Sequence, residues 1–199
     1  MTFGATPPES GTLNIGRDRV ELNGMSPRRA IGMGCILIPG DRLAGTIPSL
    51  TVCDNVNQPV LIWVSRAWAL AQAALVRNAS LLANRFDVRP RDPMRLLGAL
   101  SGGNQQKALL AKWFQTAPRL ILLDEPTQGV DVGARAQVFE AIEGVARSGA
   151  AVLCASSDYE QLTAICDRVL VFSRGAVTED LAADKINKSA IAQACYRAG

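Results

Sequence analysis

Short apolar runs and segments of helical periodicity alternate through the second half of the chain. Strands that are apolar throughout and alternate with helices are typical of a parallel sheet with helices on both faces. The pattern therefore predicts an α/β fold. The predicted helices cover 104–116, 133–147 and 159–165, and the predicted strands cover 120–123, 151–155 and 169–172.

The pattern of the first fifty residues is different. Apolar segments at 12–15 and 19–22 lie on either side of a turn and predict a small antiparallel hairpin. Ser26 followed by Pro27 is typical of a helix start, so we expect a short helix there. The compact apolar run at 35–39 predicts one further strand.

The segment 51–86 is predicted to be largely helical, because its apolar residues recur at helical spacing. Its two tryptophans, Trp63 and Trp68, are expected to pack in the core or at an interface. The proline-rich segment 89–93 is predicted to form a loop.

Composition excludes several classes of protein. A hydrophobic content of 48% and a charged content of 20% over 199 residues are ordinary for a globular protein. The net charge of +3 is too small and too scattered to indicate nucleic-acid binding. No apolar stretch reaches the ~20 residues of a membrane helix. The five cysteines are far apart, which predicts reduced thiols in a cytosolic protein.

Two polar segments carry the candidate chemistry. Leu100-Ser101-Gly102-Gly103-Asn104-Gln105-Gln106-Lys107 puts a capping serine and two glycines at a helix start, where backbone N–H groups can approach an anion. Leu120-Ile121-Leu122-Leu123-Asp124-Glu125-Pro126-Thr127 is an apolar strand ending in two carboxylates. Ligands of parallel sheets bind at that edge, where an aspartate can hold Mg²⁺ and a glutamate can polarise water.

The two segments resemble the signature motif and the Walker B motif of ATP-binding cassette (ABC) proteins. Asn104 narrows the resemblance to the ATP-binding subunits of sugar importers of the ribose, galactose and xylose type. The resemblance implies a P-loop NTPase fold of the ABC-cassette type, with a parallel sheet, flanking helices, a helical subdomain and a small N-terminal antiparallel β piece. It also implies that Ser101, Gly102, Gly103 and Gln105 bind ATP in trans.

Further roles follow from the same resemblance. Asp124 would bind Mg²⁺ through water, and Glu125 would be the catalytic Walker B glutamate. Asp131 in Gly129-Val130-Asp131 resembles the D-loop, although it is equally plausible as a residue at the start of the next helix. Gly40 stands where the family has the glutamine of the glutamine loop, and Ser157 stands where it has the switch histidine. Ser157 and Glu160 have the spacing of a capping box.

No Gly-rich loop ending in Gly-Lys-Ser or Gly-Lys-Thr occurs in the sequence. We therefore expect residues 1–199 to form a single, N-terminally truncated cassette that lacks Walker A and corresponds to the second cassette of a tandem protein. The expected parts are a β-rich part at 10–50, a helical subdomain at 51–99, a core with the signature helix and Walker B at 100–181, and a tail at 182–199. Loss of a central strand leads us to expect an isolated protein that is poorly soluble or molten.

The resemblance implies an ATP-binding and ATP-hydrolysing component of a carbohydrate importer, with ATP and Mg²⁺ as cofactors. The implied partners are a second cassette, a membrane permease and, indirectly, a sugar-binding protein, at the cytoplasmic face of the membrane. The isolated chain is expected to be inactive in hydrolysis. Two alternatives remain open, namely a non-catalytic regulatory or remnant cassette, and a non-transport ABC ATPase of DNA repair or translation.

Overall fold

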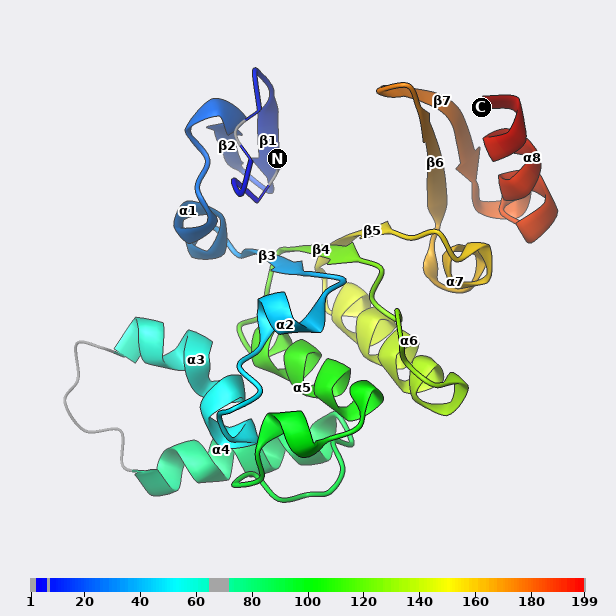
Figure 1. Cartoon of the computed structure of the whole chain (residues 1–199). Coiled ribbons are helices and arrows are strands. Elements are labelled where there is room, and N and C mark those ends of the chain that lie inside the picture. The colour runs from blue at the N-terminus through cyan, green and yellow to red at the C-terminus, as the bar shows by residue number, and fades with distance from the viewer. Residues whose placement is uncertain (1–2, 7, 65–71, 199) are drawn as a thin grey trace. The chain divides into compact units, whose positions relative to one another are not determined.

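The computed structural model describes residues 3–6, 8–64 and 72–198 (Figure 1). The chain divides into two compact units, Met1–Leu153 and Cys154–Gly199, and each is described by itself. Trp68 lies outside the described residues. Trp63 lies within a helix, as predicted.

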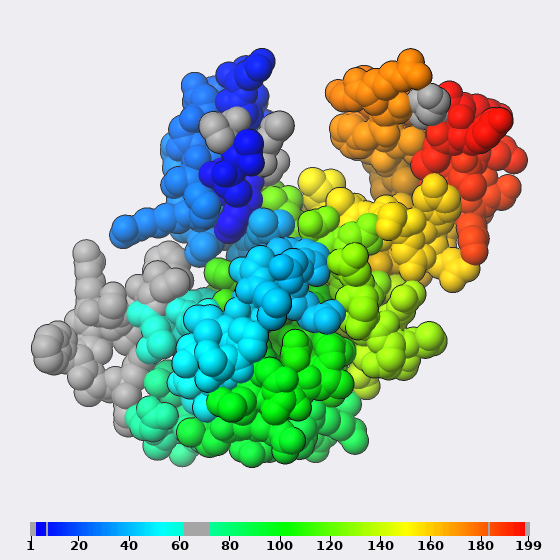
Figure 2. Space-filling model, in the orientation of Figure 1, coloured from blue at the N-terminus to red at the C-terminus, as the bar shows by residue number. Residues whose placement is uncertain are grey.

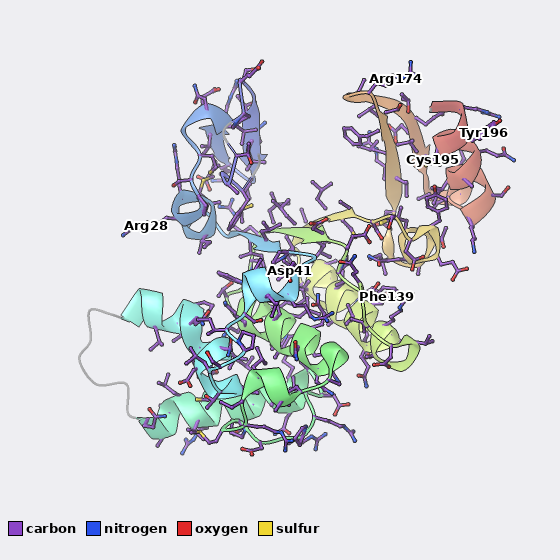
Figure 3. All side chains as sticks on the ribbon, viewed as in Figure 1. Arg28, Asp41, Phe139, Arg174, Cys195 and Tyr196 are labelled. Atoms are coloured by element: carbon purple, nitrogen blue, oxygen red, sulfur yellow. The ribbon has the colours of Figure 1, made fainter. Side chains whose placement is uncertain are left out.

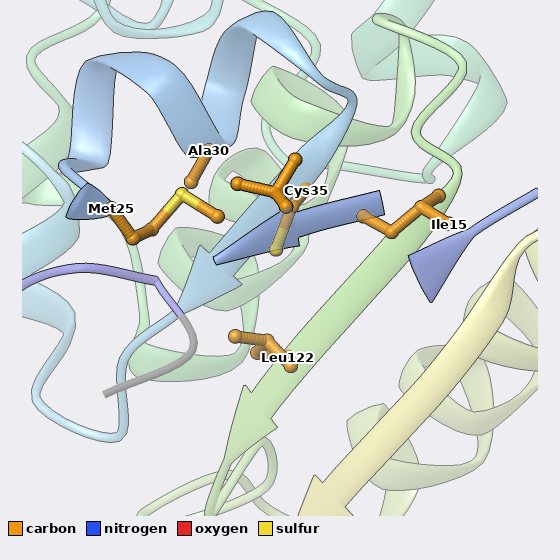
Figure 4. Close-up of a cluster of buried hydrophobic side chains, with 6 residues drawn as sticks. Ile15, Met25, Ala30, Cys35 and Leu122 are labelled. Atoms are coloured by element: carbon orange, nitrogen blue, oxygen red, sulfur yellow. The ribbon is translucent and has the colours of Figure 1, made fainter. Parts of the chain in front are cut away.

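The first unit begins with the predicted hairpin and the predicted short helix. Ser26 is the N-cap of this helix and accepts a hydrogen bond from the backbone N–H of Arg29 at 3.3 Å. The elements are β1 (Thr12–Ile15), β2 (Asp18–Glu21) and α1 (Pro27–Gly32). They enclose a small apolar core with the next strands, drawn in Figure 4, which contains Ile15, Val20, Met25, Ala30, Cys35 and Leu122.

A three-stranded sheet in the order β3-β4-β5 forms the centre of the first unit. β3 (Cys35–Ile38) and β4 (Leu120–Asp124) are parallel, with Cys35 opposite Leu120, and most of their side chains are buried. The predicted parallel sheet is therefore confirmed for this pair. Burial on both faces is wrong for β5 (Ala151–Ala155), whose Leu153 is 57% exposed, so the apolar run alone did not determine burial.

Helices pack against this sheet and against one another. α5 is the most buried of them, because it contacts α2, α3, α4 and α6. In Figure 2 the side chains of α2 to α5, coloured cyan to green, form one packed body. The helices are α2 (Arg42–Gly45), α3 (Val52–Val64), α4 (Gln72–Arg85), α5 (Gly102–Phe114) and α6 (Val132–Arg147).

The second unit is a small α/β arrangement with its own core of Leu162, Val169 and Ile191. α7 (Tyr159–Ile165) and β6 (Arg168–Ser173) match the predicted helix and strand in position. The prediction that this strand joins the parallel sheet is wrong, because β6 lies in a separate two-stranded sheet. β6 pairs antiparallel with β7 (Ala176–Ala182), and α8 (Lys188–Ala198) packs on both strands. The sequence analysis predicted neither β7 nor α8, because both are half-exposed and carry mixed polar and apolar residues.

Candidate functional site

Ser101 lies at the start of α5, as predicted, but it does not cap the helix in the expected way. It is the N-cap residue, yet its side chain makes no hydrogen bond to the backbone of the first turn. Its Oγ instead accepts a hydrogen bond from the side-chain Nδ2 of Asn104 at 2.8 Å. The Asn104 Oδ1 accepts one from the backbone N–H of Arg89 at 2.7 Å. Ser101 is an exposed residue.

The second glycine of this turn permits close contact between α5 and α6. A Cβ on Gly103 would lie 2.8 Å from the Cβ of Ala134 and 3.2 Å from Oδ2 of Asp131. Only a residue without a side chain fits at this distance. The Gln105 side chain folds back and donates from Nε2 to the Leu100 carbonyl at 2.9 Å. Hydrogen bonds from the side chains of Asn104 and Gln105 therefore hold the residues around this glycine pair in place.

Asp131 caps α6 and lies beside the glycine turn. Its Oδ1 accepts a hydrogen bond from the backbone N–H of Ala134 at 2.9 Å, so it is the N-cap of this helix. The carboxylate is at the same time next to Gly103. The structure therefore brings the predicted D-loop residue and the predicted signature residues together.

Asp124 and Glu125 follow β4 at the carboxyl edge of the sheet. Asp124 is exposed, and Glu125 has a left-handed backbone with φ of +42°, a conformation that is uncommon outside glycine. Gly40 follows β3 and touches this pair, since a Cβ on Gly40 would lie 3.1 Å from the Asp124 carbonyl oxygen and 3.4 Å from the Glu125 Cβ. Three predicted site residues therefore lie together.

Arg42 connects the two groups of residues. Its Nη1 donates to the carbonyl of Gln128 at 2.8 Å. A Cβ on Gly102 would lie 3.2 Å from Arg42 Nη2, and one on Gly129 would lie 3.4 Å from Nη1. The guanidinium therefore packs between two glycines, one of the signature turn and one of the turn after β4. Asp41, the N-cap of α2 labelled in Figure 3, precedes it.

Two buried lysines anchor α5. The Lys107 Nζ donates to the Asp87 carbonyl and, at 3.0 Å, to Oε1 of Gln137. Burial lowers the pKa of Lys107, while the hydrogen bond from Arg89 lowers the pKa of the Asp87 carboxyl group.

Lys112, which is 6% exposed, donates to the Gly45 carbonyl at 3.0 Å and to Oε1 of Gln58 at 2.5 Å. Burial lowers the pKa of Lys112 to about 8. Both acceptors are uncharged oxygens, so no carboxylate offsets the burial of the ammonium group. Lys112 thereby fixes α5 to α2 and α3.

Ser157 belongs to the second unit, where it precedes α7. The predicted capping box is wrong. Asp158 is the N-cap, and its Oδ1 accepts hydrogen bonds from the backbone N–H groups of Glu160 at 3.0 Å and Gln161 at 3.3 Å. A carboxylate one residue later offered the same cap, and sequence spacing alone did not separate the two.

The sequence analysis missed the roles of Arg42, Lys107 and Lys112, and it used Asn104 only as a marker of subtype. Arg42 contacts Gln128, which is 86 positions away in the sequence, and no local sequence pattern predicts such a contact. The two lysines offered a signal that was not used. Both adjoin a run of apolar residues in α5 and are buried with them, which is unusual for charged side chains.

The fold and the site define a class of protein. A parallel sheet carries a carboxylate pair at its edge, and a glycine turn opens the neighbouring buried helix, as in nucleotide-handling α/β cassettes. Among the described residues, no helix is both long and apolar enough to cross a membrane.

Comparison with known proteins agrees with this class. Residues 1–128 match the family model described as ABC transporter, and the chain belongs to that family. The fold is that of the ATP-binding cassette MJ0796, solved as a dimer in a post-hydrolysis state with ADP and Pi. The likeness has a TM-score of 0.71 and 21% sequence identity, and it covers 89% of this chain and 75% of that one.

Curated relatives are similar over nearly the whole chain. A putative ribose/galactose/methyl galactoside import ATP-binding protein 3 of Agrobacterium fabrum is 36% identical over 95% of this chain and 38% of its own length. The arabinose import ATP-binding protein AraG of Pseudomonas syringae pv. syringae is 38% identical over 97% of this chain and 38% of its own. The ribose import ATP-binding protein RbsA of Jannaschia is 37% identical over 90% of this chain and 34% of its own length. The chain thus spans just over a third of the length of these relatives.

Proposed function

We propose that this chain provides the signature face of a composite ATP site in a carbohydrate importer, and that another cassette holds the ATP on its P-loop. The observation that carries the proposal is the signature turn itself. Ser101 is exposed with its Oγ held by Asn104, and it stands at the start of α5 with Gly102. The first backbone N–H groups of a helix have no partner within the helix and suit a phosphate.

The carboxylate pair would form part of the chain's own nucleotide site. Mg²⁺ prefers one or two carboxylates together with phosphate oxygens and water, and Asp124 and Glu125 at the end of β4 offer that donor set. Within residues 3–6, 8–64 and 72–198, no group of three or more histidine, cysteine or acidic residues could hold a metal ion alone. A bound Mg²⁺ would neutralise phosphate charge there, with Asp124 holding it through water and Glu125 orienting the attacking water.

Two residues of the chain depart from the family pattern expected for its own nucleotide site. Gly40 touches Asp124 and Glu125 but has no side chain that could contact Mg²⁺ or water. Ser157 has a hydroxyl group where the family has an imidazole, and a serine hydroxyl group, unlike an imidazole, does not ionise near neutral pH. These two residues favour a second candidate function, a regulatory cassette that assembles with the importer without hydrolysing ATP at its own site.

An exposed apolar surface on the first unit supports a permease as partner. Leu50 and Leu96 lie on adjacent segments, because Thr51 forms an isolated β-bridge with Leu96 and the Leu97 N–H donates to the Leu50 carbonyl at 2.9 Å. Exposed apolar area of this kind marks contact surfaces. The permease would hold the chain at the cytoplasmic face of the membrane, with a sugar-binding protein as an indirect partner. Besides Leu50 and Leu96, the exposed large hydrophobic residues near them in sequence are Leu43, Ile47 and Met94.

The test uses a probe cassette of the sugar-importer family that has an intact P-loop and a substituted signature serine. A dimer of two probe cassettes should not hydrolyse ATP, because neither copy supplies the signature serine that the ATP site of the other copy requires. We expect this chain to restore ATP hydrolysis to the probe, and we expect Ser101→Ala to lower the restored rate. Binding without restored hydrolysis would favour the regulatory cassette, and the absence of both would contradict the proposal.

A further inference from the structure

The amide of Asn104 has one possible orientation in the structure. A backbone N–H can only donate, so the atom of Asn104 that faces the Arg89 N–H at 2.7 Å must be the carbonyl oxygen. The other atom, which faces Ser101 Oγ at 2.8 Å, is then the NH₂ group. The direction of the second hydrogen bond follows from the first and does not depend on which amide atom is labelled as nitrogen.

This orientation fixes the role of the Ser101 hydroxyl group. A serine hydroxyl has one hydrogen to donate and two lone pairs to accept. Since Asn104 donates to it, one lone pair is occupied and the hydroxyl hydrogen is directed elsewhere. Among the described residues, no acceptor for that hydrogen is found, and the serine is exposed. The hydroxyl group is therefore prepared to donate to an acceptor from outside the chain.

We propose that Asn104 is a positioning residue that makes Ser101 a hydrogen-bond donor toward the phosphate of the nucleotide held by the partner cassette. This inference rests on the proposed function. Without Asn104 the hydroxyl group rotates and also accepts hydrogen bonds from water. If an acceptor replaces the NH₂ group at position 104, the Ser101 hydroxyl group donates its hydrogen to that acceptor and can no longer donate it to the phosphate.

Asn104→Asp separates this role from a structural one. The aspartate keeps an oxygen for the Arg89 N–H, so the loop contact survives, but it accepts from Ser101 where asparagine donates. We expect this variant to keep its thermal unfolding midpoint and to lower the restored ATPase rate of the probe cassette at least as much as Asn104→Ala does. For Asn104→Ala we expect a loss of about threefold to tenfold, the range for one neutral hydrogen bond.

The decisive comparison is a double-mutant cycle. If Asn104 acts through Ser101, Asn104→Ala lowers the rate in the wild-type chain and has no further effect in the Ser101→Ala chain. An equal loss in both backgrounds would assign Asn104 a structural role and overturn the inference. If the wild-type chain does not restore hydrolysis, the proposed function fails. If it does restore hydrolysis but the cycle shows no coupling between Asn104 and Ser101, only this inference fails.

A second measurement needs no nucleotide or partner. The side-chain NH₂ resonances of Asn104 in the ¹⁵N-labelled chain report its hydrogen bond directly. We expect Ser101→Ala to shift one of these two protons upfield, and we expect Ser49→Ala, at another exposed serine of the same unit, to leave both unchanged. Resonances that do not respond to Ser101→Ala would overturn the inference, whatever the ATPase result.

Discussion

Arg42 donates a hydrogen bond from its Nη1 to the backbone carbonyl of Gln128, at 2.8 Å. This contact joins the first residue of α2 to the turn after β4, and the guanidinium is packed between Gly102 and Gly129. Gly40, two residues before Arg42, contacts Asp124 and Glu125. The segment from Gly40 to Arg42 therefore contacts both groups of site residues.

Arg42→Ala is expected to loosen both turns. The variant loses one charge-assisted hydrogen bond and the packing between two glycines. We expect amide hydrogen exchange in peptides covering 126–131 and 100–104 to become about tenfold faster. The matched control is Arg29→Ala, because Arg29 also donates to a backbone carbonyl, that of Gly24 at 3.2 Å, away from the site. Unchanged exchange in both peptides would show that Arg42 does not hold the turns.

Gly103→Ala is expected to push α5 and α6 apart. The added Cβ would meet the Ala134 Cβ at 2.8 Å, a distance at which one of the helices must move. We expect the free energy of unfolding to fall by about 1–3 kcal/mol, as for other overpacked sites. Chemical denaturation measures this change, and the cooperative transition that it requires would contradict the expectation of a molten isolated chain.

Gly144→Ala is the control for that substitution. Gly144 lies within α6, and an added Cβ there would meet nothing within 4 Å. Because alanine favours a helix, the control should raise the free energy of unfolding by about 0.5–1 kcal/mol. If Gly103→Ala also raised the free energy of unfolding, the close approach of α5 and α6 at Gly103 would be refuted.

Asp131 combines a capping role with a position beside Gly103, and two substitutions separate these roles. Asp131→Ala removes the cap of α6 and should lower the free energy of unfolding by about 1 kcal/mol. Asp131→Ser keeps a capping oxygen and should retain most of the stability, while it removes the carboxylate from the signature turn. Thermal and chemical unfolding of the three proteins test this order, and equal losses in both variants would contradict it.

Lys112 should make stability depend on pH in a defined window. Its pKa is lowered from the ordinary 10.5 to about 8 in the folded chain. Between these values the unfolded chain binds more protons than the folded chain, so the free energy of unfolding rises with pH. The contribution of Lys112 is up to about 3 kcal/mol across the window.

Other groups titrate in the same range, so the measured quantity is a difference between variants. Burial raises the pKa of Cys35 to about 11, which lowers stability as the pH rises from 9. Lys112→Gln should remove the rising contribution, so its stability relative to wild type should fall between pH 8 and pH 10. The exposed Lys185→Gln serves as control. A difference that is independent of pH would show that Lys112 does not lose its proton in this range.

The sequence predicted the elements that have a strong local pattern. The hairpin at Thr12–Ile15, the helix that begins at Pro27, β4 and α6 all follow from apolar spacing and turn residues. β7 and α8 were missed, because an element that is half-exposed on a small unit shows no clean period.

The candidate site was predicted in its motifs and not in its contacts. Proximity of Asp131 to Gly103 depends on how two helices cross, and the partner of Arg42 lies 86 positions away. The side chain of Ser101 was expected to cap a helix and instead accepts from Asn104, three residues on. Local propensity identified the residue that begins the helix, while side-chain competition decided its hydrogen bond.

The most direct test of the central claim measures whether the signature face closes over ATP held by another cassette. This chain is mixed with a P-loop-bearing cassette of the sugar-importer family whose Walker B glutamate is replaced by glutamine, and the mass of the complex is measured by light scattering. We expect a heterodimer with ATP, none with ADP, and none with ATP when Ser101 is replaced by arginine. A heterodimer that forms equally with ADP, or that tolerates Ser101→Arg, would contradict the account.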